Sequence, residues 1–171
     1  MDWEQAMRTE LFAPLKMRET GFGAPPGSGI WGRQTVNGLL QPVDPKGGMA
    51  DNPAVLGPSG GVHVTPGDYA RFLSLFLLNG SPLLNPATLE HLLDPPARAL
   101  SYAGGWSLVG PPGNISESLT HNGSNTLWFA TALIKRSQKI AYAAMTNQGG
   151  GKGKKVTDDL IENLEIKPAP G

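Results

Sequence analysis

Cysteine is absent from the 171 residues, which excludes disulfide bonds and thiolate metal sites. Neither sign of charge is in excess, because 14 lysines and arginines balance 14 aspartates and glutamates. A nucleic-acid partner, which requires a basic surface, is therefore not expected. No apolar run approaches the roughly 18–20 residues of a membrane span. The acidic start, Met1 to Gln5, does not resemble a signal peptide, so we expect neither a membrane span nor an export signal in this chain.

Candidate metal ligands are equally sparse. The three histidines, His63, His91 and His121, lie far apart in the sequence, and none has a second ligand at helical spacing. The tract at residues 149–155 contains glycine and lysine but lacks the Lys-Ser or Lys-Thr ending of a phosphate-binding loop. We expect no metal and no cofactor, and we interpret this tract as a flexible connector.

Glycine and proline are abundant, with 23 and 16 copies, which predicts long ordered loops between the regular elements. Apolar spacing predicts helices at 2–12, 65–79, 85–93 and 156–164, the last with Val156, Leu160, Ile161 and Leu164 inward. Strands are expected at 105–109, 127–134 and 139–146, with a hairpin turn at 136–138. No period holds from residue 16 to 58, which we interpret as a long loop.

The helix expected from residue 65 has the clearest start. Thr65 is a capping residue, Pro66 suits the first helical position, and Asp68 stands where a capping-box carboxylate reaches back. Helices and loops in residues 1–100 precede antiparallel strands and a final helix in residues 101–171. This order predicts an α+β fold, with an antiparallel sheet flanked by helices in a single domain.

One serine lies in a possible nucleophile elbow, Gly57-Pro58-Ser59-Gly60-Gly61. Asp68 or Asp94 and then His121 follow it in the order Ser, Asp, His. An elbow requires a strand that enters it and a helix that leaves it, yet Asn52-Pro53 interrupts the approach and 62–64 separates Ser59 from the next helix. We therefore favour a tight turn and keep an α/β-hydrolase built on Ser59 as a lesser hypothesis.

A second candidate site is His121-Asn122-Gly123-Ser124, just before the paired strands. Its glycine lets a ligand approach the backbone, and a histidine beside a free N–H suits an anionic group or a developing oxyanion. An Asn-Gly turn at a strand end explains the same residues, so the motif alone leaves both interpretations open.

Several segments together resemble the serine β-lactamase, penicillin-binding protein and carboxylesterase superfamily, especially its class C-like branch. The segment 10–22 resembles the family's "PLGM…T-x-F", and 60–72 resembles its "GG-x-x-S/T-x-x-D-x-x-x-F" helix entry. Trp106 follows Gly104-Gly105 as in the family's "G-x-G-W" strand. His121 to Ser124 stands where the Lys/His-x-Gly-Ser/Ala motif belongs, and 144–147 resembles the end of the last strand. The resemblance covers nearly the whole chain in order.

Two motifs that the resemblance implies are missing. No serine has lysine three residues later, and no tyrosine has asparagine two residues later, so neither Ser-x-x-Lys nor Tyr-x-Asn occurs. Both motifs normally precede the segments matched here. We therefore expect a partial β-lactamase/transpeptidase-like fold that lacks its N-terminal strands and nucleophile helix, and no catalytic residue in this chain.

The resemblance implies an acyl-transfer hydrolase acting on β-lactams, D-amino peptides or esters, with His121, Asn122, Gly123 and Ser124 as the substrate-binding and oxyanion residues. Histidine at 121 is more typical of esterase-like and D-aminopeptidase-like members, and full-length members are periplasmic or secreted. The alternative is a non-catalytic relative that binds a ligand or partner. The last strand, 139–147, pairs with an N-terminal strand in the family; without it we expect an open apolar edge, and a chain that belongs to something larger or self-associates.

Overall fold

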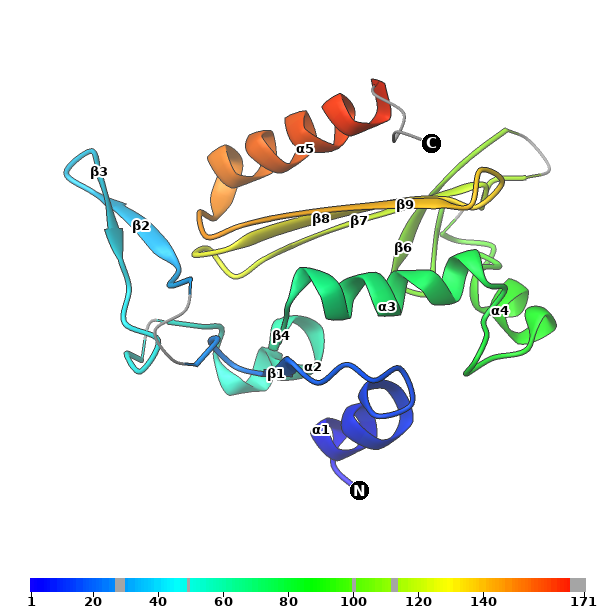
Figure 1. The fold of residues 1–171 in the computed structure, drawn as a ribbon, viewed down its shortest axis with the longest axis horizontal. Coiled ribbons are helices and arrows are strands. Elements are labelled where there is room, and N and C mark those ends of the chain that lie inside the picture. The colour runs from blue at the N-terminus through cyan, green and yellow to red at the C-terminus, as the bar shows by residue number, and fades with distance from the viewer. Residues whose placement is uncertain (27–29, 49, 100, 112–113, 167–171) are drawn as a thin grey trace.

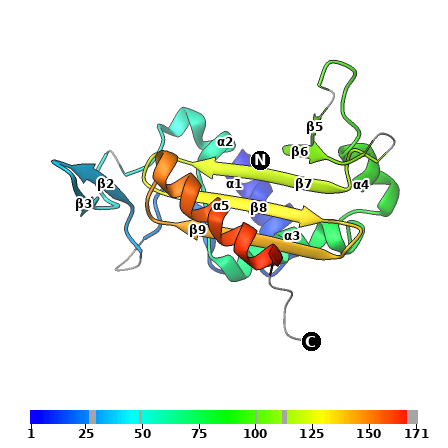
Figure 2. The same cartoon turned by 90° about the horizontal axis from the view of Figure 1, so that it is seen from above.

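The computed structural model describes residues 1–26, 30–48, 50–99, 101–111 and 114–166. In this part of the chain a five-stranded antiparallel sheet follows chain order: β5 (Tyr102–Ala103), β6 (Trp106–Val109), β7 (Ser118–Ser124), β8 (Phe129–Lys135) and β9 (Ile140–Thr146). Helix α5 (Gly150–Ile166) covers one face, and α3 (Pro66–Leu77) lies against the other (Figures 1 and 2). The α+β fold with a helix-flanked antiparallel sheet is therefore confirmed.

The remaining elements lie on the α3 side or beyond the ends of the sheet (Figure 1). The chain begins with α1 (Trp3–Ala6), continued by a π-helix (Met7–Phe12), and α4 (Pro86–Leu92) follows α3. A 3₁₀ turn (Ala54–Leu56) leads into the short α2 (Gly57–Gly60). Two small antiparallel pairs complete the fold: β1 (Thr20–Phe22) with β4 (Val62–Val64), and β2 (Arg33–Val36) with β3 (Leu39–Pro42).

The main core lies between the sheet and α3. Trp106 is 3% exposed and packs against the rings of Phe72 and Phe76, while Leu119 and Ile134 are fully buried. The same cluster includes Phe12 from the first helical segment. The N-terminal helices and the C-terminal strands thus share one core, although the sequence pattern divides them.

The capping signals predicted the helix starts correctly. The Thr65 hydroxyl accepts from the Asp68 N–H at 3.3 Å, Pro66 is the first helical residue, and Asn85 caps α4 in the same way. The Asp68 carboxylate, however, does not complete a capping box. It is 2% exposed and accepts from the Glu19 N–H at 2.6 Å and the Thr20 hydroxyl at 3.0 Å, which ties β1 to α3.

The prediction of a structureless loop from 16 to 58 is wrong, because three strands lie within it. The missed signal is Asn37-Gly38, which joins β2 to β3. Both residues have positive φ, 50° and 80°, as a two-residue hairpin turn requires. The β1 strand has a different cause: its partner β4 lies about forty residues away, so no local pattern marks it.

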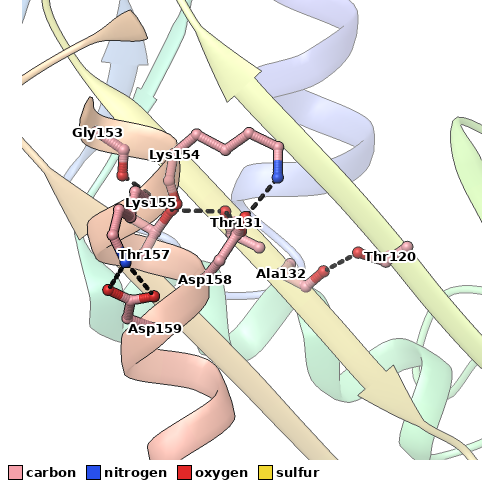
Figure 3. A network of polar contacts seen from close by, with 9 residues as sticks. All are labelled: Thr120, Thr131, Ala132, Gly153, Lys154, Lys155, Thr157, Asp158 and Asp159. Atoms are coloured by element: carbon pink, nitrogen blue, oxygen red, sulfur yellow. Dashed lines mark hydrogen bonds and ion pairs between the residues drawn. The ribbon is translucent and has the colours of Figure 1, made fainter. Parts of the chain in front are cut away.

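The predicted flexible connector at 149–155 is also wrong, since α5 begins at Gly150. Its glycines allow close packing on the sheet: a Cβ at Gly153 would lie 1.9 Å from the Gln148 carbonyl oxygen. One turn later the Thr157 and Thr131 hydroxyls are 2.8 Å apart in the buried interface (Figure 3). Of the four apolar residues expected to face inward, only Ile161 is buried; Val156, Leu160 and Leu164 are 54%, 48% and 43% exposed.

Two further predictions concern absences. Within the described ranges, no helix is both long and apolar enough to span a membrane. Among the same residues, no three histidine, aspartate or glutamate side chains gather as metal ligands would.

Candidate functional site

The motif His121 to Ser124 is not a turn before the strands; it is the second half of β7. The sequence pattern missed this strand, because its polar and glycine residues give no apolar alternation. On one side all four residues pair with β8, from His121 opposite Ala132 to Ser124 opposite Phe129. On the other side β6 pairs only with Ser118 to Thr120. The motif therefore lies where β7 extends beyond its shorter neighbour.

The backbone of this extension has a defined direction. The Arg136 N–H donates to the Glu117 carbonyl at 2.9 Å, so Glu117 directs its backbone groups toward β8. Backbone groups alternate along an antiparallel strand, so His121 and Gly123 also bond toward β8. Asn122 and Ser124 direct their N–H and C=O groups to the other side, where β6 has ended. Two backbone N–H groups thus face an edge that no strand covers within the described residues.

Side chains at the motif are exposed. His121 lies on the α3 face of the sheet, because it is two residues from the buried Leu119, and its ring lies edge-on to Trp106 at 6.2 Å between centroids. A Cβ placed on Gly123 would meet no atom within 4 Å. Open space at Gly123 and a histidine supported by a buried tryptophan leave room for a ligand along this edge.

The turn after Ser124 is held by side-chain hydrogen bonds. The Ser124 hydroxyl donates to the Trp128 carbonyl at 2.8 Å and accepts from the Thr126 N–H. The Asn125 carbonyl oxygen accepts from the N–H groups of Leu127 and Trp128, and its amide donates to Asp51 at 2.8 Å. Asp51 comes from the segment expected to be a loop, and no spacing in the sequence links it to Asn125.

A second segment from the same region closes this end of the sheet. The Trp128 indole N–H donates to the Ile30 carbonyl at 3.2 Å, and the Asn147 amide donates to the Trp31 carbonyl at 2.8 Å. Gly32 is buried between them, and a Cβ there would lie 2.6 Å from Leu127. These contacts fix the β7–β8 turn, and with it the position of Ser124.

The structure does not form the Ser59 elbow. A 3₁₀ turn enters Ser59 and β4 follows α2, so a strand–serine–helix order is absent here, and the Ser59 hydroxyl donates to the Leu56 carbonyl. His63 contacts the Gly23 carbonyl through Nδ1 at 2.8 Å, and Asp68 is buried with its own partners. Asp94 and His91 line an open pocket beside α4. The tight-turn interpretation of 57–61 is confirmed.

Comparison with protein families decides the relationship, since the Beta-lactamase family model matches residues 1–165. This chain belongs to the β-lactamase family. No curated protein sequence matches it.

Solved structures show the same fold at low sequence identity. The octameric penicillin-binding protein homologue from Pyrococcus abyssi aligns with a TM-score of 0.71 at 18% identity, over 98% of this chain and 38% of that one. A penicillin-binding protein from Bacillus halodurans gives 0.74 and 18%, over 95% and 49%. A D-stereospecific amidohydrolase from Streptomyces sp. gives 0.59 and 16%, over 90% and 47%. This family member therefore spans less than half the length of the structures it resembles.

Proposed function

We propose that this β-lactamase family member provides the substrate-facing strand of a serine hydrolase that transfers acyl groups from β-lactams, D-amino peptides or esters. The observation that carries the proposal is the uncovered half of β7, where the Ser124 N–H faces open space beside His121. The similarity to penicillin-binding proteins and to a D-stereospecific amidohydrolase supports this range of substrates.

Each residue of the motif has a proposed role. The Ser124 N–H donates to the oxyanion that forms when an acyl carbonyl is attacked. His121 contacts a substrate carboxylate or the leaving group, and its ring orientation is set by Trp106. Gly123 lets the substrate backbone lie against the strand, and Asn122 presents the neighbouring N–H. A strand edge of this kind binds a planar acyl group by backbone hydrogen bonds.

The nucleophile of the proposed reaction lies outside these 171 residues. Acyl-enzyme formation needs an activated nucleophile, and the chain contains neither Ser-x-x-Lys nor Tyr-x-Asn. A single oxyanion donor does not form an acyl-enzyme. Residues 1–171 by themselves are therefore expected to be inactive.

Covalent labelling tests this division of roles. The chain is incubated with fluorescent penicillin and with p-nitrophenyl acetate, and the intact mass is measured. No adduct is expected. A saturable adduct on Ser59, or on any residue of this chain, would overturn the assignment of the nucleophile and revive the α/β-hydrolase hypothesis, which Ser59→Ala would then decide.

The oxyanion role is tested in a longer form of the polypeptide that includes a Ser-x-x-Lys segment. Ser124→Pro deletes the outward N–H, and the β7–β8 ladder is kept because that N–H does not face β8. Loss of one oxyanion donor reduces kcat by about 10²–10³. Ser124→Ala, which keeps the N–H and loses the hydroxyl bonds of the turn, is the matched control. Equal rates for the two variants would contradict the role.

The second candidate function is ligand or partner binding without turnover, and the absent Ser-x-x-Lys and Tyr-x-Asn motifs favour it. The genomic sequence upstream of the codon for Met1 discriminates between the two. An in-frame Ser-x-x-Lys and Tyr-x-Asn supports the hydrolase. A stop codon and an independent promoter, together with equilibrium binding of penicillin G without hydrolysis, support the binding module.

A further inference from the structure

The outer edge of β9 is unpaired along most of its length. Ladder alternation, counted from the Arg136 to Glu117 bond, directs Lys135, Leu133 and Thr131 of β8 toward β9. Their partners Ile140, Tyr142 and Ala144 bond back to β8. The backbone groups of Ala141, Ala143 and Met145 therefore point outward, and no strand of the described residues pairs with them.

This edge already forms pairing bonds at one end. The Arg33 N–H donates to the carbonyl of Asn147, the next outward residue, at 3.0 Å, and Arg33 makes a parallel bridge with Gln148. From Ile140 to Thr146 there is no charged residue and no proline. Protective charges and prolines are the usual means by which a sheet blocks addition of a strand, so this edge is open to one.

An exposed apolar stripe on α5 lies above the same edge. The β8 side of α5 is marked by Asp158, which contacts Thr131, and by Glu165, which pairs with Lys135. Because α5 lies across both β8 and β9, the opposite flank of the helix faces β9. Val156, Leu160 and Leu164 occupy that flank at intervals of four residues and are about half exposed.

The stripe and the edge are centred at the same height. Thr131 contacts Thr157 and pairs with Ala144, so residue 157 of the helix is level with residue 144 of the strand. One strand residue spans about 3.3 Å and one helical residue about 1.5 Å, so Ala143 is level with Leu160. Above the middle of the open edge stands the middle of the apolar stripe.

We propose that this surface, which we call the open flank (the β9 edge from Ala141 to Met145 with Val156, Leu160 and Leu164), binds an extended polypeptide strand. The strand is uncharged over about seven residues and apolar on both faces. Its backbone pairs with Ala141, Ala143 and Met145, and its side chains on one face cover the α5 stripe. Strand addition of this kind takes its affinity from the backbone bonds and its specificity from the side-chain contacts.

A single strand fits the open flank better than a second copy of the sheet. On the face opposite α5, helix α3 packs chiefly against β9 itself, as Figure 2 also shows. Two copies joined edge to edge through β9 would hold their α3 helices about one strand spacing apart, roughly 5 Å. Packed helices need about 8–10 Å between their axes. An added strand brings no such helix with it.

The probe is a fluorescent peptide in which seven alternating valines and alanines are flanked by lysines, and its binding to the chain is measured by anisotropy. Ala143→Pro deletes one outward N–H and leaves the β8 ladder intact, while Leu160→Glu places a charge in the stripe. Each is expected to weaken binding at least about tenfold. Leu92→Glu, at a leucine of α4 with 43% exposure, is the matched control and should bind as the wild type does.

Amide hydrogen exchange provides a measurement that needs no variant: bound peptide should slow exchange at Ala141, Ala143 and Met145 and leave Tyr142 and Ala144 unchanged. No binding by the wild type, equal binding by Leu160→Glu, or protection elsewhere would overturn the proposal. So would a concentration-dependent dimer in sedimentation that Ala143→Pro abolishes, because the occupant would then be a second copy. These measurements do not depend on acyl transfer, so they stand or fall separately from the proposed function.

Discussion

At the scale of single residues, Asp68 shows how a motif position can be structural. Its carboxylate is 2% exposed, accepts from Glu19 and Thr20, and pairs with Arg71 at 2.8 Å. Asp68→Ala leaves these donors without an acceptor and should reduce the free energy of unfolding by about 3 kcal/mol in urea titrations. Asp159→Ala, which removes an exposed i,i+4 pair with Lys155, should cost about 0.5 kcal/mol or less. Equal losses would show that Asp68 does not anchor β1.

A second residue links burial to alkaline stability. Burial raises the pKa of the Tyr69 phenol from 10.0 to about 12. The folded state therefore holds this proton between those pH values while the unfolded state releases it, so stability is intact below pH 10 and is lost as pH rises toward 12, by up to about 2 kcal/mol. Tyr69→Phe should remove this part of the decline, which urea unfolding between neutral pH and pH 11 would measure. Parallel curves for the two proteins would contradict it.

At the scale of elements, the two glycines of α5 make opposite predictions. A Cβ at Gly153 would meet the Gln148 carbonyl oxygen at 1.9 Å and Phe129 at 2.8 Å, so Gly153→Ala should lift the helix from the sheet and cost about 1–3 kcal/mol. At Gly151 a Cβ meets nothing within 4 Å, so Gly151→Ala should stabilise the helix by about 0.5 kcal/mol. Thermal unfolding of both variants measures the difference, and a shared sign would refute the packing argument.

Elements with local signals were predictable, and elements whose causes are distant were not. Thr65-Pro66 and Asn85-Pro86 fixed two helix starts, and alternating apolar residues predicted β8 and β9 to within about two residues. The first turns of α5 were missed because their glycines have poor helix propensity, and packing on Phe129 outweighs it. The second half of β7 was missed because its polar residues are organised by β8. The residue identities at the candidate site were therefore predictable, whereas the strand that presents them was not.

At the scale of the whole molecule, the site depends on segments that no sequence spacing connects. Asp51 holds Asn125, and Ile30 to Gly32 hold Trp128, so the supposed loop of the first half supports the turn beside Ser124. The two parts predicted from the sequence, 1–100 and 101–171, accordingly share the core that contains Phe12, Phe76 and Trp106. A core shared in this way predicts one cooperative domain, not two that fold separately.

Tryptophans placed at the two ends of that core allow the prediction to be tested. Among the four tryptophans, Trp3 lies against Phe22 in the first half, and Trp106 lies in the sheet core of the second. In variants that keep only one of them, the fluorescence of each should report the same urea midpoint, because unfolding either part exposes the other's apolar face. The matching control is the far-UV signal of each variant, which corrects for its change in stability. If Trp3 reports an earlier midpoint than the far-UV signal of the same variant, the N-terminal helices unfold as a separate unit. The support that residues 30–51 give to the Ser124 turn would then have to come from those residues alone.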